Sequence, residues 1–347
     1  MKGLLYSIAI ILDNIRKFFV STLIKLVLIF LIVGIVHNVL KMSEVSTRYT
    51  GPYKNLEFIY ESKMMNVYQT SDGDKTVVIL AKYGTESPII QYKNLIEDLK
   101  VNYKVVVVEL FGYGFSMGTD IDRSNEQIAA EIKTALEQAN VGGPYVFLTH
   151  GLSDIYAMEI QKESPELVSG IFSIDPVYPN EMKDEYMKQA WEDYIVNVRI
   201  TSVVEFSGFA RIASYIKEDL FNIDKMKNHP EIFTNSDINI YRQRIGSSYL
   251  TSTMVKEINA APENLEKLED YTYPDYLPTR QILTTYQIDK YKAYKAAGAE
   301  KDSEELSEEL ITNPSIQLIK TISADKTPEF SNPDDLSQEV IYFLTSF

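Results

Sequence analysis

The chain of 347 residues contains no cysteine and only three histidines, His37, His150 and His229. Without cysteine it forms no disulfide and offers no thiolate to a metal ion, and the redox compartment is left open. Three imidazoles also leave few positions for a histidine general base. We expect neither a metal site nor a cofactor.

Positive charge is scarce as well, with 34 lysines and arginines against 49 acidic residues and a formal net charge of −15. Nucleic-acid binding needs clustered cations along the phosphate backbone, so we expect no nucleic-acid partner. Residues 1–41 differ from the rest, because they hold five basic residues and one acidic residue. With 45% hydrophobic residues over its 347 residues, the whole chain is long enough to bury a sizeable core.

The longest apolar run occupies residues 18–40 and contains Lys25 near its start. As a helix rising about 1.5 Å per residue it would be roughly 35 Å long, enough to cross a bilayer core of about 30 Å. A cleaved signal peptide would have a shorter apolar region and a small-residue cleavage site, which the following HNVLKMSEVS does not offer. We predict one uncleaved anchor, in which the Lys25 ammonium reaches the headgroups.

The flanks of this run indicate its orientation. Arg16 and Lys17 precede it, whereas basic and acidic residues mix after it, which favours a cytoplasmic N-terminus and places the remaining chain outside the cell membrane. The predicted segments are a cytoplasmic stretch at 1–17, the anchor at 18–40, a linker at 41–54 and a globular domain at 55–347. Residues 3–12 lie in the membrane interface as an amphipathic turn, extend the anchor or form a frayed apolar leader.

Six continuous apolar runs divide the domain and are typical of strands buried on both faces. They lie at residues 76–81, 104–110, 145–150, 170–175, 281–286 and 316–322. Helical patterns separate them, as after Ser124, where Gln127 has capping-box spacing. The alternation predicts an α/β protein with a mostly parallel sheet. Residues from about 177 to 275 are expected to form a helical insertion over one sheet edge.

Several motifs follow one another at the ends of these runs. In order they read VVILAKYGTESP, VVVVELFGYGFS, PYVFLTHGLSDIYAMEI, SIDPVYP and TISADKTPEFSNPDDLSQEVIYFL. Their order and spacing resemble the α/β-hydrolase family over roughly residues 55–347. The resemblance implies an eight-stranded, mostly parallel sheet with helices on both faces, a helical lid at about 177–275, and ancestors that hydrolysed esters, amides or similar bonds.

The chemistry of that family needs a serine at a sharp strand-to-helix turn, a histidine after the last strand and an acid that orients the histidine. Carried over by position, the serine place is Gly151, the histidine place falls at about Lys326 and the acid place falls near Gln287. The family's histidine comes last in the chain, and no histidine follows His229. The triad is therefore degenerate, and we expect a pseudoenzyme that binds a ligand or partner. The alternative is an active serine-type hydrolase, for ester or amide bonds, with a non-standard site.

Three residues are candidate replacements for the lost groups. Ser153 is the obvious nucleophile, but it lies about 200° around the helix from the turn and is expected to cap backbone N–H groups. Asp154 is a possible carboxylate nucleophile, although the resemblance places such aspartates at the tip of the turn. Lys326 would act as a base only if it were desolvated, because burial lowers the pKa of a lysine. Without a nucleophile at the turn, it has no proton to accept.

Ligand binding is expected to rely on the backbone. The amides of Tyr83 and Leu152 stand where the family's oxyanion donors would be. His150 is either a packed histidine or part of the pocket edge, and Asp175 is either a strand-end cap or an acid of the site. His229 is a residue of the lid region.

The expected partners are the membrane, through a single-pass anchor, and a small-molecule, lipid or peptide ligand or another protein.

Glycine at position 151 fits a strained turn at little cost in conformational energy.

Overall fold

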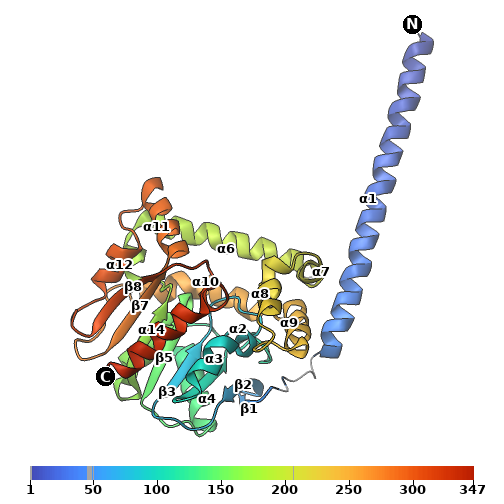
Figure 1. Ribbon diagram of the computed structural model, residues 1–347. Coiled ribbons are helices and arrows are strands. Elements are labelled where there is room, and N and C mark those ends of the chain that lie inside the picture. Colours follow the sequence, from blue (N-terminus) through green and yellow to red (C-terminus); the bar gives the residue numbers. More distant parts are fainter. Residues whose placement is uncertain (1, 45–48, 50, 206) are drawn as a thin grey trace.

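The computed structural model describes residues 2–44, 49, 51–205 and 207–347 (Figure 1). Its strands form one eight-stranded sheet in the order β1-β2-β4-β3-β5-β6-β7-β8 within these residues. The bounds are β1 Lys54–Tyr60, β2 Lys63–Gln69, β3 Thr76–Leu80, β4 Lys104–Glu109, β5 Tyr145–His150, β6 Val168–Ile174, β7 Thr279–Thr284 and β8 Gln317–Ile322. β2 is antiparallel to both neighbours, and the strands from β4 to β8 are parallel.

The predicted α/β architecture with a mostly parallel sheet is confirmed. Alternate residues of β3 point to opposite sides, so Val78 and Leu80 belong to one core cluster and Val77 and Ile79 to the other. The first cluster includes side chains of α4 (Asn125–Gln138), α5 (Asp154–Glu163) and α10 (Ser252–Glu266). The second includes those of α2 (Pro88–Gln91), α3 (Lys93–Leu99), α9 (Asn235–Ser248) and α14 (Pro333–Thr345). Helices thus cover both faces of the sheet.

A helical insertion separates β6 from β7. It contains a short turn of 3-10 helix (Pro179–Lys183), α6 (Glu185–Glu205), α7 (Phe209–Ile216), α8 (Ile223–Asn228), α9 and α10. After β7 come α11 (Thr285–Ala297), α12 (Ser303–Glu309), β8 and α13 (Pro328–Ser331). In Figure 1, α6 and α7 run along the upper side of the domain, toward α1.

The helix predicted after Ser124 forms as α4, and the Ser124 hydroxyl accepts the Gln127 N–H at its start, at 3.4 Å. The strand expected at 281–286 is Thr279–Thr284, because the chain turns into α11 directly after it.

One long helix, α1 (Lys2–Glu44), precedes the domain. It contains a stretch from Ile11 to Met42 with a mean hydropathy of 2.8, which is long and apolar enough to cross a membrane. Residues 3–12 continue the same helix rather than forming a separate turn. Within the expected linker, residues 45–48 and 50 lie outside the described residues, while Tyr49 and Tyr53 are buried in the core.

Candidate functional site

Gly151 lies at the tip of a sharp turn between β5 and α5. The strand ends at His150, and a single turn of 3-10 helix (Gly151–Ser153) leads directly into α5. Gly151 has a φ of +62°, in the left-handed region that other residues rarely adopt. A Cβ at this position would meet the Lys82 Cγ at 3.8 Å and the Asp175 carbonyl at 3.9 Å. The turn therefore has room for a side chain but carries no functional atom.

Ser153 lies beneath this tip and is almost completely buried. Its oxygen accepts the His150 N–H at 3.0 Å and donates to the Leu80 carbonyl at 2.8 Å. The hydroxyl thus ties the turn to the end of β3. Its hydrogen-bond partners among the described residues are backbone groups of Leu80 and His150, so Ser153 is placed for a structural role.

Asp154, the first residue of α5, is fully buried. One carboxyl oxygen accepts the hydroxyls of Thr149 and Ser173, each at 2.6 Å. Burial raises the pKa of Asp154 to about 6, and the two hydroxyl donors oppose that shift. The carboxyl group therefore joins β5, β6 and α5 in the interior.

Gln287 lies at the position expected for the acid of the triad. Its side-chain amide connects the start of α11, directly after β7, to the chain that follows β6. The Gln287 side chain donates to the Pro176 carbonyl at 2.8 Å, just after β6. Beside it, the Asp175 carboxylate accepts both the N–H and the hydroxyl of Thr284, each at 2.8 Å, at the end of β7. Burial raises the pKa of Asp175, while these bonds and the Lys82 ammonium oppose the shift. Asp175 therefore caps the strand ends.

Lys82, which sequence reasoning did not single out, lies between the positions expected for the serine and the histidine. It follows β3, and its stem passes close to Gly151. Its ammonium donates to the backbone carbonyl of Lys326 at 2.9 Å, whereas the Lys326 side chain is exposed. Burial lowers the pKa of Lys82, and the carboxyl groups of Asp175 and Glu329 oppose that shift. The sequence signal that could have identified Lys82 is its position as a lysine just after a continuously apolar, buried strand.

No family model matches the chain. The uncharacterized protein YbdG of Bacillus subtilis (strain 168) is 23% identical over 256 residues, which make up 72% of this chain and 76% of that protein. Epoxide hydrolase VrEH1 from Vigna radiata is similar in structure, with a TM-score of 0.66 and 16% identity over 86% of this chain and 100% of that one. A laboratory-evolved variant of potato epoxide hydrolase StEH1 gives a TM-score of 0.63 and 15% identity, over 85% and 100% of the two chains.

The chain has the α/β-hydrolase fold. The resemblance seen in the motifs is thereby confirmed at the level of the fold, and Gly151 stands at the turn where α/β hydrolases carry their nucleophile. At these sequence identities the likeness says nothing of activity.

His150 of this α/β-hydrolase fold is fully buried beside the turn. Its Nδ1 lies 2.9 Å from the Tyr92 hydroxyl. The Tyr92 oxygen also accepts the Lys82 N–H at 3.2 Å, which leaves the tyrosine proton for His150. Burial holds the pKa of His150 well below its usual range. The imidazole is therefore a neutral, packed group and not part of an open pocket edge.

Glu329 of α13 lies near the same ring nitrogen of His150, with Oε2 3.9 Å from Nδ1. Gln91 donates to its other oxygen at 2.6 Å, and burial raises the pKa of Glu329 to about 7. Neither Glu329 Oε2 nor His150 Nε2 has a hydrogen-bond partner in the described part of the chain. The side chains of Gln91, Tyr92, His150 and Glu329 thus form a buried polar cluster.

The two residues expected to supply oxyanion donors, Leu152 and Tyr83, follow β5 and β3 respectively. Leu152 directly follows Gly151 and its side chain is buried. Tyr83 directly follows Lys82, and its hydroxyl donates to the Met254 carbonyl of α10 at 3.1 Å. A Cβ at the next residue, Gly84, would meet nothing within 4 Å. The loop after β3 is therefore tied to the insertion at Tyr83 and open at Gly84.

His229 lies apart from these groups, at the end of α8. It is partly exposed, and its Nδ1 lies 3.1 Å from Glu231. Among the described residues, no three histidine, aspartate or glutamate side chains are grouped as metal ligands.

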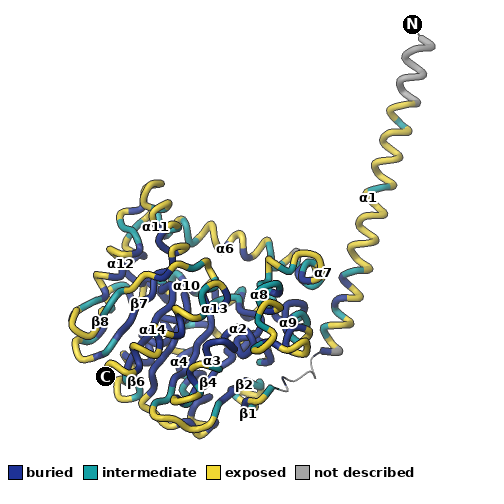
Figure 2. Tube along the Cα trace, in the orientation of Figure 1, coloured by how far each residue is buried: buried dark blue, intermediate teal, exposed yellow. Residues whose placement is uncertain are grey.

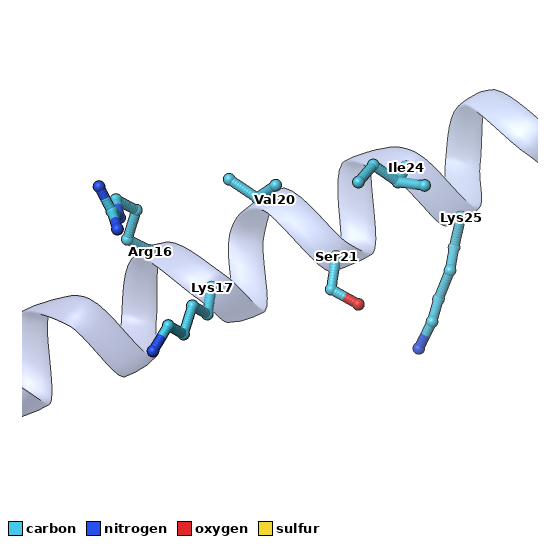
Figure 3. Close-up of a pocket in the computed structure, with 6 residues that line it drawn as sticks. All are labelled: Arg16, Lys17, Val20, Ser21, Ile24 and Lys25. Carbon is cyan, nitrogen blue, oxygen red and sulfur yellow. The ribbon is translucent and has the colours of Figure 1, made fainter.

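Two surface hollows lie elsewhere. One is lined by Asp120, Ile121, Asp122, Arg123, Lys256, Asn259 and Ala260. The other lies on α1, between the side chains shown in Figure 3.

Proposed function

We propose that this chain is a membrane-anchored α/β-hydrolase-like protein that has lost catalysis and binds a ligand or a partner protein at the cell surface. One observation carries the proposal: the Lys82 side chain passes Gly151 and donates to the Lys326 carbonyl, across the places where the serine and histidine would stand. Gly151 carries no side-chain atom that could attack a substrate, so hydrolysis through an acyl intermediate lacks its nucleophile at this turn.

The alternative function is an active hydrolase with a non-standard site. The solved structures named above are epoxide hydrolases, but a shared fold does not carry their activity to this chain. The contacts of Ser153 and Asp154 argue against either as the nucleophile, because both side chains are buried and already hydrogen-bonded in the interior. The inactive protein is therefore the function that the geometry supports best.

The surroundings of Gly151 favour a ligand that carries oxygen. The Lys82 ammonium is half-buried and adds a positive charge beside the amides that follow β3 and β5. A carbonyl or carboxylate oxygen of a small molecule, lipid or peptide would complement these donors. We propose Tyr83, Leu152 and Lys82 as its first contacts, through backbone amides and the ammonium. His150 would act from behind, by fixing Tyr92.

We further propose that α1 is a single-pass anchor with its N-terminus in the cytoplasm and the domain outside. Figure 3 shows Lys25 on the same side of α1 as Lys17, leaning back toward the N-terminal flank. An ammonium in that position reaches the headgroups near Arg16 and Lys17. In this arrangement, residues 1–17 are cytoplasmic, 18–40 cross the membrane, and the insertion at about 177–275 acts as a lid.

A fluorophosphonate probe tests the loss of a serine nucleophile, because it bonds covalently only to an activated hydroxyl. The full chain in detergent is incubated with the probe and weighed by intact-protein mass spectrometry, beside an active serine hydrolase as positive control. We expect no adduct above that of a Ser153→Ala variant. A stoichiometric adduct on one serine, abolished by Ser153→Ala, would overturn the proposal.

A further inference from the structure

The helices α6 and α7 carry large apolar side chains on their outer surface, where the described chain does not cover them. These are Val196, Ile200 and Val203 on α6 and Phe209, Ile212 and Ile216 on α7, here called the α6–α7 face. The spacings of three, four and seven residues place each set on one side of its helix. Phe209 is 60% exposed and Ile216 is 72% exposed. Figure 2 shows the exposed residues along both helices.

The inner side of α7 is fixed to the C-terminal part of α1. Arg211 forms two hydrogen bonds with the Glu44 carboxylate, at 2.7 and 2.8 Å, and both side chains are largely buried. The His37 ring packs against Gly208, where a Cβ would lie 2.6 Å from the ring. These contacts place α7 beside the last two turns of α1.

This attachment sets the height of the α6–α7 face relative to a membrane. From Phe18, where the apolar run begins, to His37 the helix rises roughly 28 Å, close to a bilayer core of about 30 Å. If Phe18 lies at one boundary of the core, then His37 and the attached α7 lie at the other. Figure 1 shows α6 and α7 on the side of the domain from which the free part of α1 extends.

We propose that the α6–α7 face inserts into the outer lipid surface of the same bilayer that α1 crosses. The inference rests on the proposed membrane anchor and adds a second, peripheral contact to it. Exposed apolar patches of this kind mark sites for a protein or a membrane, and this one lies at the level where lipid begins. The domain would then rest on the membrane through its insertion.

Attraction between charges is not the driving force of this contact. The chain has a formal net charge of −15, and residues 1–41 are its only strongly basic part. Anionic lipid headgroups would repel such a domain, so the α6–α7 face binds the membrane by burying its apolar surface in the lipid. We therefore expect contact with neutral phosphatidylcholine, and little change when salt is added.

Site-directed spin labelling tests the contact, and the absence of cysteine means that no native thiol must first be removed. Single cysteines replace Phe209 and Ile216, and the labelled full chain is reconstituted into phosphatidylcholine vesicles. Val27 in the middle of α1 serves as the control for the anchor. Val101, which is apolar and 75% exposed on the domain, serves as the matched control for exposure. Collision rates with oxygen, which partitions into lipid, and with a water-soluble nickel chelate report the surroundings of each label.

We expect labels at Phe209, Ile216 and Val27 to collide more with oxygen than with the nickel chelate, and the label at Val101 to show the reverse. A lipid-exposed Val27 label with water-exposed labels at Phe209 and Ile216 would overturn the second contact and leave the anchor intact. A water-exposed Val27 label would overturn the anchor itself. Immobile labels at Phe209 and Ile216, shielded from both reagents, would show that another protein or a second copy covers the face, and would also overturn the inference.

Discussion

Glu109→Gln is expected to make the domain more stable above about pH 8, and to leave its stability nearly unchanged at pH 5. Glu109 ends β4 and is fully buried. One carboxyl oxygen accepts the Phe115 N–H at 2.7 Å, and the other has no hydrogen-bond partner among the described residues. Burial raises the pKa of Glu109 from 4.5 to about 8, although backbone donors and Arg244 oppose the shift.

The sign of the pH dependence follows from this raised pKa. The folded protein holds the Glu109 proton more tightly than the unfolded chain does. Protonated Glu109 therefore contributes fully to the free energy of unfolding below pH 4.5, and this contribution is lost as the pH rises from 4.5 through about 8. The loss in the free energy of unfolding is on the order of 5 kcal/mol, since the pKa rises from 4.5 to about 8 and each pKa unit corresponds to about 1.4 kcal/mol. Glutamine has the shape of the protonated acid and does not ionise, so it avoids this loss.

Urea unfolding of the full chain in detergent, followed by circular dichroism from pH 5 to pH 9, measures the effect. The exposed Glu166→Gln is the matched control and is expected to change the curves little at any pH. If Glu109→Gln lowered stability equally at pH 5 and pH 9, ionisation of Glu109 would not be the cause and the prediction would be wrong.

Removing one partner of the buried Arg123–Glu131 ion pair is expected to destabilise the domain by about 3–5 kcal/mol. Arg123 donates from one nitrogen to both carboxyl oxygens of Glu131 at 2.8 Å, and both side chains are almost fully buried. Glu131→Ala would leave the guanidinium charge in the interior without its counter-charge. The Arg123 carbonyl also accepts the Asn264 side chain of α10, so this pair supports the attachment of the insertion.

A double variant separates the charge effect from lost packing. Arg123→Met with Glu131→Leu removes both charges and keeps most of the side-chain volume, and we expect it to recover most of the stability that Glu131→Ala loses. Urea midpoints of the single and double variants provide the comparison. A Glu131→Ala variant within about 1 kcal/mol of the native chain would show that solvent reaches the pair.

The parallel part of the sheet was predictable because its strands are buried on both faces and read as continuous apolar runs. β1 and β2 were not identified, since KNLEFIY and KMMNVYQ mix polar and apolar residues at the antiparallel edge. The start of β7 was missed for a related reason. Arg280 within it is buried only because it pairs with Glu339 at 2.9 Å, a contact that the local pattern does not reveal.

The turn at Gly151 was predicted by comparing motifs along the chain, and the assignment of Gln287 and Lys326 to the other two triad positions stays a prediction. Lys82 was not predicted, because its role depends on a carbonyl 244 residues away, and a lone lysine after a strand resembles a surface residue. The packed state of His150 depends likewise on Tyr92 and Glu329, from two separate helical segments. Local sequence predicts the turn and the residue at its tip, whereas tertiary packing decides which side chains surround it.

We propose that the groups around Gly151 do not catalyse hydrolysis. Turnover of p-nitrophenyl esters and of aromatic epoxides by the full chain in detergent measures this activity, because it detects a serine or a carboxylate nucleophile alike. We predict rates equal to the detergent background for the native chain, for Lys82→Met and for Asp154→Asn. Saturable turnover by the native chain that disappears in Asp154→Asn or Ser153→Ala would contradict the account.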